Sequence, residues 1–223
     1  LDRVLETVLQ VPFVARIVVL GQAPATLRRG AAARFRDDPR VAWIEAGAGI
    51  SESLRGVVGG AAAPWPVLVT TADHPLLSVE MLESFVAAGG DEDVAVAMVE
   101  RATILARYPE TKRTWLRFRD GAWSGANLFT LRGPAAARAL DLWSEVEQNR
   151  KRPLKLFWRF GPLFTLRALT RSIGLGDAVA RIGRRFGVKA RLIPLDYAEA
   201  EIDVDKPSDH ALAEAILLAS GRG

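Results

Sequence analysis

The chain has 223 residues, of which 49% are hydrophobic and 25% charged, and its formal net charge is +4. These values are typical of a folded globular chain and exclude collagen-like and disordered classes. The sequence has no cysteine and two histidines, His74 and His210, which excludes disulfides, thiolate metal sites and a histidine-rich zinc site.

Helical and strand patterns alternate along the first hundred residues. An amphipathic helix over residues 1–10 precedes a buried strand at 16–21, which is β-branched and closed by glycine. The next elements are predicted as helix 25–38, strand 41–47, helix 51–61, strand 67–73, helix 78–89 and strand 93–99. Strands that alternate with helices predict an α/β fold with a mostly parallel, helix-covered sheet.

The pattern changes after residue 113. Two strand-like segments flank Asp120 and Gly121, a pair suited to a tight hairpin turn, so residues 114–132 are expected to be antiparallel. The remaining predicted elements are helices 133–151, 153–173 and 175–187, strand 189–195, a short strand 200–205 and helix 207–220. The second of these helices is interrupted at Gly161 and Pro162.

Positive charge is concentrated in residues 150–191. This window holds 12 Lys or Arg and one acid, Asp177, whereas the rest of the chain holds 18 basic and 25 acidic residues. We interpret the window as a basic, largely helical insertion that packs its apolar face on the sheet. Its field suits a phosphorylated small molecule or an anionic membrane surface, and nucleic acid is not the expected partner.

No part of the sequence is suited to span a bilayer. The longest uncharged run, residues 56–72, contains glycines and prolines that exclude one membrane-spanning helix. The amino end has no secretory signal pattern, and a cytoplasmic location is expected.

A candidate metal ligand stands at the end of the predicted strand 67–73. Asp73 follows the apolar strand directly, at the carboxyl edge where open α/β sheets bind ligands, and Pro75 turns the chain away. Mg²⁺ prefers carboxylate and phosphate oxygens, so Asp73 predicts a magnesium site. The alternative is that Asp73 only caps the next helix.

Two further carboxylates, Asp203 and Asp205, lie two positions apart near the end of the chain. In an extended segment they share one side, where two like charges favour a cation between them. If their strand end lies near Asp73, the carboxylates hold Mg²⁺ together. The alternative is a pair of solvated acids ahead of a helix.

Four segments resemble the MobA-like NTP transferases, the group of the molybdenum-cofactor nucleotidyltransferases. In chain order they are GISESLRGVV, VLVTTADHPLL, SGANLFTLR and EIDVDKPSDHALAEAIL. The resemblance implies a Rossmann-like, GT-A-type fold in a single domain over residues 1–223. It also implies Mg²⁺-dependent transfer of a nucleotidyl group from an NTP, CTP or GTP, to a phosphorylated small-molecule acceptor, with release of pyrophosphate.

The resemblance also implies roles for individual residues. Asp73 matches the metal-binding aspartate and is the expected catalytic residue, and either Asp203 or Asp205 falls on the second acidic position. The nucleotide-side loop corresponds to Ser51, Ser53 and Leu54. The acceptor side corresponds to Gly125 and Asn127, and Lys112 and Arg113, just before the hairpin, are further candidates for holding an acceptor phosphate.

The family's opening strand and glycine-rich triphosphate loop are not found ahead of Leu1, which corresponds to the helix that normally follows them. We therefore expect an N-terminally truncated domain, and the alternative is a degenerate member of the family. Two other functions stay open from the sequence. One is a GT-A glycosyltransferase that uses a sugar nucleotide, with Asp203 and Asp205 as its metal motif. The other is a noncatalytic binding module that acts through the basic segment.

Overall fold

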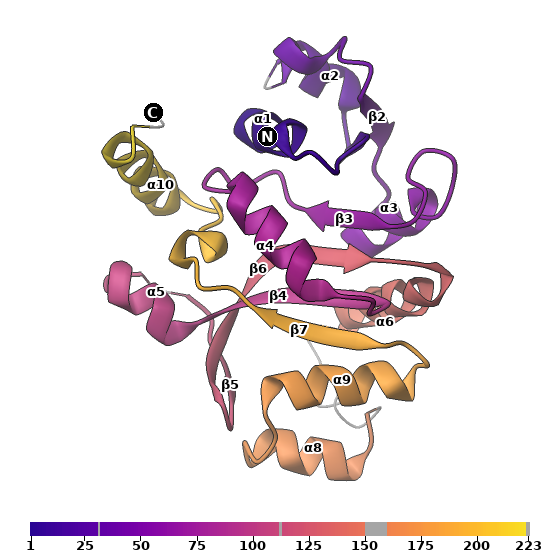
Figure 1. Ribbon diagram of the computed structural model, residues 1–223, viewed down its shortest axis with the longest axis vertical. Helices are drawn as coiled ribbons and strands as arrows, with labels where there is room; N and C mark the ends of the chain where they lie inside the picture. The colour runs from indigo at the N-terminus through magenta and orange to yellow at the C-terminus, as the bar shows by residue number, and fades with distance from the viewer. Residues whose placement is uncertain (31, 112, 150–159, 222–223) are drawn as a thin grey trace.

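The computed structural model describes residues 1–30, 32–111, 113–149 and 160–221 (Figure 1). The strands are β1 (Ile17–Gly21), β2 (Val41–Glu45), β3 (Val67–Thr70), β4 (Val94–Glu100), β5 (Leu116–Phe118), β6 (Gly121–Leu131) and β7 (Ala190–Pro194). The α-helices are α1 (Asp2–Gln10), α2 (Pro24–Arg29), α3 (Ile50–Val57), α4 (Val79–Gly89), α5 (Arg101–Arg107), α6 (Ala137–Asn149), α8 (Pro162–Leu169), α9 (Leu175–Arg185) and α10 (Pro207–Ala219). The short 3₁₀ helices are η1 (Ala33–Phe35), η2 (Pro134–Ala136) and η3 (Ala198–Glu201).

These strands form two sheets. β1 and β2 pair in parallel, and the five-stranded sheet has the order β3-β6-β4-β7, with β5 paired to β6. β4 and β7 are parallel, whereas β6 runs antiparallel to β3, β4 and β5. The predicted α/β class is confirmed. The long strand β6 opposes its neighbours because it leaves β5 through the expected hairpin, in which Phe118 pairs with Gly121.

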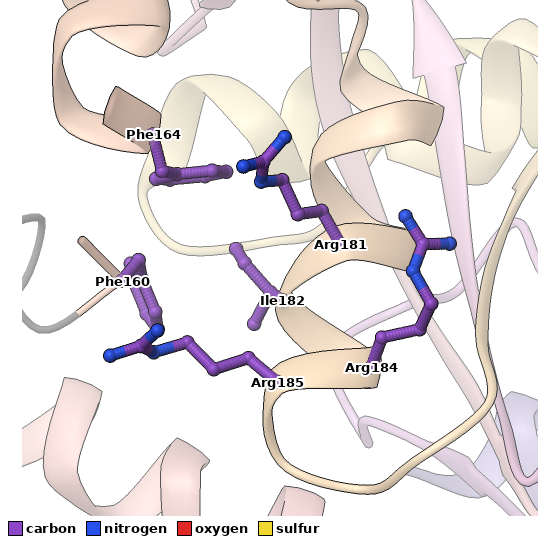
Figure 2. Close-up of a pocket in the computed structure, with 6 residues that line it drawn as sticks. All are labelled: Phe160, Phe164, Arg181, Ile182, Arg184 and Arg185. Atoms are coloured by element: carbon purple, nitrogen blue, oxygen red, sulfur yellow. The ribbon is translucent and has the colours of Figure 1, made fainter. Parts of the chain in front are cut away.

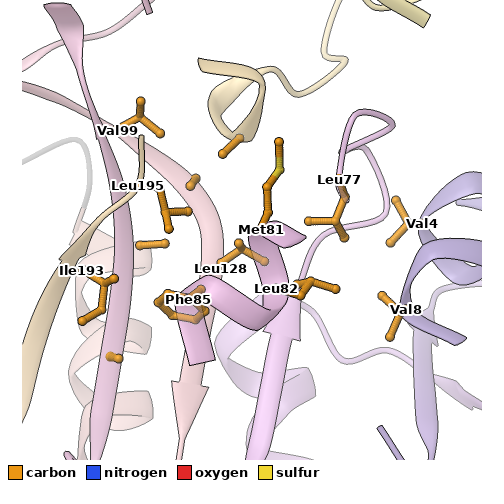
Figure 3. Close-up of a cluster of buried hydrophobic side chains, with 14 of the residues drawn as sticks. Val4, Val8, Leu77, Met81, Leu82, Phe85, Val99, Leu128, Ile193 and Leu195 are labelled. Carbon is orange, nitrogen blue, oxygen red and sulfur yellow. The ribbon is translucent and has the colours of Figure 1, made fainter. Parts of the chain in front are cut away.

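Side chains of β4 alternate between the two faces of the sheet, as the pleat requires. Ala95, Ala97 and Val99 join the core cluster that contains Phe85 of α4, whereas Val94 belongs to a second cluster with helix α6. Figure 3 shows α4 between the sheet and α1, with Phe85 directed at the strands. Burial of each large apolar side chain contributes roughly 1.5–3 kcal/mol to the stability of the fold. Packing on both faces therefore fixes the position of β4 in the sheet.

The structure differs from the predicted elements at three places. The short strand predicted at 200–205 is wrong, because η3 ends at Glu201 and the chain then meets the loop after β3 through one hydrogen bond, Val204 N to Asp73 O, and not through a ladder. Helix α5 directly follows β4 and was not predicted. The helix predicted at 25–38 is divided into α2 and η1.

The basic insertion is only partly within the described residues. Helix α8 begins at Pro162, as proline at the first helical position favours, after Gly161 with φ of 101°. Helix α9 packs on β7, where Gly183 allows close contact, since an added Cβ would lie 2.6 Å from the carbonyl oxygen of Val188. Residues 153–159 of the predicted helix 153–173 lie outside the described residues. No helix in the described ranges has the length and hydropathy needed to cross a membrane.

Candidate active site

Three carboxylates from two distant segments of the chain meet at one point. Asp73 follows β3, and Asp203 and Asp205 follow η3. One oxygen from each of the three lies within 4.8 Å of the others. The Asp73 carbonyl accepts the hydrogen bond from Val204 N at 2.9 Å, so the backbone itself fixes this juxtaposition.

The Asp73 side chain is shaped to receive a cation. Its Oδ1 is buried and accepts no hydrogen bond from any described residue. A buried carboxylate oxygen without a donor is costly, and a hard cation would satisfy it together with the other two carboxylates. This set of oxygen donors fits Mg²⁺.

His74 anchors the turn beside this aspartate. Its side chain is buried, and Nε2 lies 3.3 Å from the backbone oxygen of Glu199 in η3. Burial lowers the pKa of His74, which keeps the imidazole neutral. His74 therefore ties the β3 end to η3 without adding a positive charge to the cluster.

Arg113 lies behind the carboxylates. Its side chain is only 10% exposed, and Nη1 donates to Asp203 Oδ1 at 2.6 Å. The same guanidinium lies 3.4 Å from Glu201 Oε2 and 3.8 Å from Asp209 Oδ1. One cation thus faces three carboxylates, which leaves an excess of negative charge for a bound metal to balance. In this position Arg113 holds acids, whereas the sequence suggested an acceptor phosphate.

Further hydrogen bonds hold the acidic segment that surrounds Arg113. Ser124 of β6 donates to Glu201 Oε1 at 2.7 Å, and both residues are buried. Burial raises the pKa of Glu201 against the opposing effects of Ser124 and Arg113. Asp209, in the first turn of α10, accepts a hydrogen bond from Asp205 N at 3.3 Å. The acidic segment is therefore held from the sheet and from α10.

A bulge in β6 directs Asn127 to the same place. The register with β4 shifts between Val96 and Met98, and Asn127 adopts φ of 50°, which asparagine tolerates better than most residues. Asn127 Nδ2 then lies 3.4 Å from Asp203 Oδ2. Gly125 is exposed, and a Cβ there would meet no atom within 4 Å, so its surroundings are open.

The predicted nucleotide-side loop is ordered by an acidic residue from α6. Glu147 accepts hydrogen bonds from Ile50 N, Ser51 N and Ser51 Oγ, the last at 2.6 Å. A carboxylate at the start of α3 is favoured by the partial positive charge of a helix N-terminus. The Glu147 carboxylate therefore occupies the amides of Ile50 and Ser51 and the Ser51 hydroxyl at the start of α3.

Ser53 and Leu54 complete this loop. Ser53 Oγ donates to Gly49 O at 2.6 Å and accepts from Gly47 N at 2.9 Å, and Leu54 is buried against α6. Their present contacts shape the loop. Lys112 lies outside the described residues.

Sequence reasoning missed Glu147 and the partners of Arg113. Glu147 lies 96 residues after Ser51 in the sequence, and no local spacing pattern predicts a contact between residues so far apart. Glu201 and Asp209 belong to the segment in which Asp203 and Asp205 were predicted to bind a metal. Their contacts with Arg113 depend on how η3 and α10 pack, which the sequence does not show.

Comparisons with known proteins agree with this architecture. The profile of the MobA-like NTP transferase domain matches residues 1–182. The structure is similar to a hypothetical transferase from Thermus thermophilus, with a TM-score of 0.77 and 28% identity over 93% of this chain and 84% of that one. Among curated proteins, no match was found.

Two other solved structures show the fold alone. One is 4-diphosphocytidyl-2C-methyl-D-erythritol synthase from Anaerococcus prevotii, with a TM-score of 0.56 and 11% identity over 97% of this chain and 85% of that one. The other is 2-C-methyl-D-erythritol 4-phosphate cytidylyltransferase from Francisella tularensis, with a TM-score of 0.53 and 11% identity over 96% and 86%. Since the family profile covers most of the sequence, the chain belongs to the MobA-like NTP transferase family and is a nucleotidyltransferase.

Proposed function

We propose that the carboxylate cluster supports Mg²⁺-dependent transfer of a nucleotidyl group from CTP or GTP to a phosphorylated small molecule. The observation that carries the proposal is the meeting of Asp73, Asp203 and Asp205 within 4.8 Å, with a buried Asp73 oxygen that lacks a donor. Carboxylates at a sheet edge bind a magnesium–triphosphate complex through the metal. No cysteine or histidine nucleophile is needed for such a transfer.

The reaction exchanges one phosphoanhydride bond for another. An oxygen of the acceptor phosphate attacks the α-phosphorus of the NTP, the bond from that phosphorus to the bridging oxygen breaks, and pyrophosphate leaves. When bound, Mg²⁺ supplies charge neutralisation for the triphosphate. The three aspartates would hold the metal, and Arg113 positions Asp203 for this task.

The two remaining groups of residues would hold the substrates. We place the nucleotide beside Ser51, Ser53 and Leu54, the residues that correspond to the nucleotide-side loop of the family, in a loop that Glu147 and Gly49 hold in shape through hydrogen bonds. We place the acceptor beside Gly125 and Asn127, where the bulge of β6 opens space next to Asp203.

The test measures pyrophosphate release with each NTP, Mg²⁺ and a panel of phosphorylated acceptors. Asp73→Asn is expected to lower kcat by at least about 100-fold, the usual cost of losing one strong electrostatic contact in a reaction of this kind. The matched control is Asp91→Asn, since the Asp91 side chain is fully exposed and forms a surface ion pair with Arg132. This control should retain full turnover.

A metal-binding readout separates the site from the reaction. Mn²⁺ titrated by calorimetry should bind the parent chain and the Asp91→Asn control, and should bind Asp73→Asn much more weakly. Undiminished turnover in Asp73→Asn would overturn the proposal. Thermal protection by a nucleoside-diphosphate sugar, with none by an NTP, would instead favour a glycosyltransferase.

A further inference from the structure

Helix α8 exposes a stripe of leucines. Leu163, Leu166 and Leu169 are 57%, 58% and 61% exposed, and their spacing of three places them on one side of the helix. Single exposed apolar residues are common. Three on one side of a short helix form an apolar patch, and such patches mark sites of interaction with a protein or a membrane.

The other side of α8 is anchored in the protein. Phe164 is 3% exposed and packs in a cluster with Ile173, which precedes α9, and with Ala178 of α9. Phe164 also lies 5.5 Å from Phe160, ring centroid to ring centroid, in an edge-on arrangement. The leucine stripe is therefore presented outward by a packed pair of helices.

Basic residues lie next to the anchored side of α8, around Phe160 and Phe164. A hollow of about 410 Å³ between α8 and α9 is lined by Phe160, Phe164, Ile182 and three arginines, Arg181, Arg184 and Arg185. Figure 2 shows Arg181 reaching toward Phe164 and Arg185 toward Phe160 at this hollow.

An adjoining hollow extends the positive surface. It measures about 160 Å³, shares Arg181 and Arg184 with the first, and adds Arg167 of α8. Asp177 also lines it and lies 3.4 Å from Arg119. Within residues 160–191, Asp177 is the one acid in the sequence against seven Lys or Arg.

We propose that the α8–α9 surface docks on an anionic phospholipid bilayer. The leucines of α8 would enter the boundary between headgroups and acyl chains, and Arg167, Arg181 and Arg184 would contact headgroup phosphates. Helices that lie in a membrane interface combine these two features, an apolar face and flanking Lys or Arg. A nucleic acid would use the arginines but has no use for the exposed leucines.

This proposal does not depend on the proposed reaction. The surface lies on α8 and α9, whereas the metal cluster lies at the end of β3 and after η3. Vesicle binding can therefore be measured with the Asp73→Asn variant as well, and the two proposals can fail separately.

The first experiment is sedimentation of the full chain with vesicles of phosphatidylcholine alone or with 30% phosphatidylserine. We expect binding to the anionic vesicles only. Replacing Leu163, Leu166 and Leu169 together by serine should weaken partitioning at least tenfold. Leu218→Ser, which changes a leucine that is 72% exposed on α10, is the matched control and should bind like the parent.

A charge variant tests the contribution of the arginines to vesicle binding. Arg181→Gln with Arg184→Gln should weaken partitioning about tenfold or more at physiological salt, as loss of two surface arginines predicts. Arg28→Gln with Arg29→Gln removes the same charge from exposed positions on α2 and should leave binding unchanged. Circular dichroism confirms that each variant is folded.

A site-specific probe keeps the proposal testable if the triple variant misfolds. The chain has no cysteine, so Leu166→Cys can carry one environment-sensitive fluorophore. Its emission should shift to the blue with anionic vesicles, whereas a fluorophore at Leu218→Cys should not respond. The proposal is overturned by no vesicle binding, by equal binding of the leucine variant, by a probe already shielded without vesicles, or by RNA binding that survives leucine replacement and exceeds vesicle binding.

Discussion

The acidic cluster and the α8–α9 surface each bring like charges together, but the charges of the first are partly buried and paired whereas those of the second are exposed. At the cluster, Asp73 and the segment of Asp203 are held close by the Val204–Asp73 backbone bond, and the buried Arg113 pairs with Asp203, Glu201 and Asp209. On α9, Arg181, Arg184 and Arg185 are exposed and line the hollow beside Phe160 and Phe164 (Figure 2). Crowded charges need a built-in counter-charge when buried, whereas exposed charges are screened by water.

This difference separates stability from recognition. A buried ion network is expected to contribute to folding, because removing one partner leaves uncompensated charge. Exposed arginines contribute little to folding, and we propose that Arg181 and Arg184 contact a partner. Three substitutions test that contrast.

Replacing Arg113 should have the largest effect. Arg113→Met leaves buried Glu201 and its neighbour Asp203 without their cation, and we expect the free energy of unfolding to fall by about 3–5 kcal/mol in urea denaturation without metal. Arg117→Met, at an exposed position on β5, should change it by less than about 0.5 kcal/mol. Equal stability of the two variants would contradict a structural role for the buried cation.

Phe164 tests whether the two regions are energetically independent. Phe164→Ala removes the buried anchor of α8 and should lower the free energy of unfolding by about 3 kcal/mol. Mn²⁺ binding, measured by calorimetry, should not change. Leu163→Ala on the exposed side of the same helix is the control and should be nearly neutral. A parallel loss of Mn²⁺ affinity in Phe164→Ala would show that the regions are coupled.

Asp205 gives the smallest expected change in stability and sharpens the comparison within the cluster. Its side chain is exposed, so Asp205→Asn should alter the free energy of unfolding by less than about 0.5 kcal/mol. Mn²⁺ affinity should nevertheless fall, by roughly tenfold, because one ligand charge is lost. Asp203→Asn should reduce both quantities, since Asp203 also binds Arg113 at 2.6 Å. Identical behaviour of the two variants would be evidence against this division of roles.

Much of the fold was predictable from local patterns. The β-branched runs of β1, β3 and β4 and the hairpin before Gly121 identified strands because their side-chain period and turn chemistry are local properties. Helix α5 was missed because it is short and starts in the residue after a strand, with no separating turn signal. The pattern of residues 200–205 predicted a strand. In the structure Ile202 is buried although its segment belongs to no strand.

The candidate site was predictable in its composition and not in its contacts. Asp73, Asp203 and Asp205 attracted attention because acids after apolar segments suit a metal. Arg113 was read as a phosphate ligand, since a sequence shows that an arginine is present but not which groups surround it. Glu147 gave no signal, because its role arises from α6 packing against the start of α3.

By itself, the sequence determined the α/β class, the oxygen-rich chemistry and the separation of an acidic body from a basic segment. These properties follow from residue types and their short-range spacing. Tertiary structure alone decided that residues 73 and 203 share a site, that Arg113 is buried among acids and that the α8 leucines face outward. Such contacts depend on which distant segments pack together, and packing joins positions whose separation along the chain carries no periodic signal.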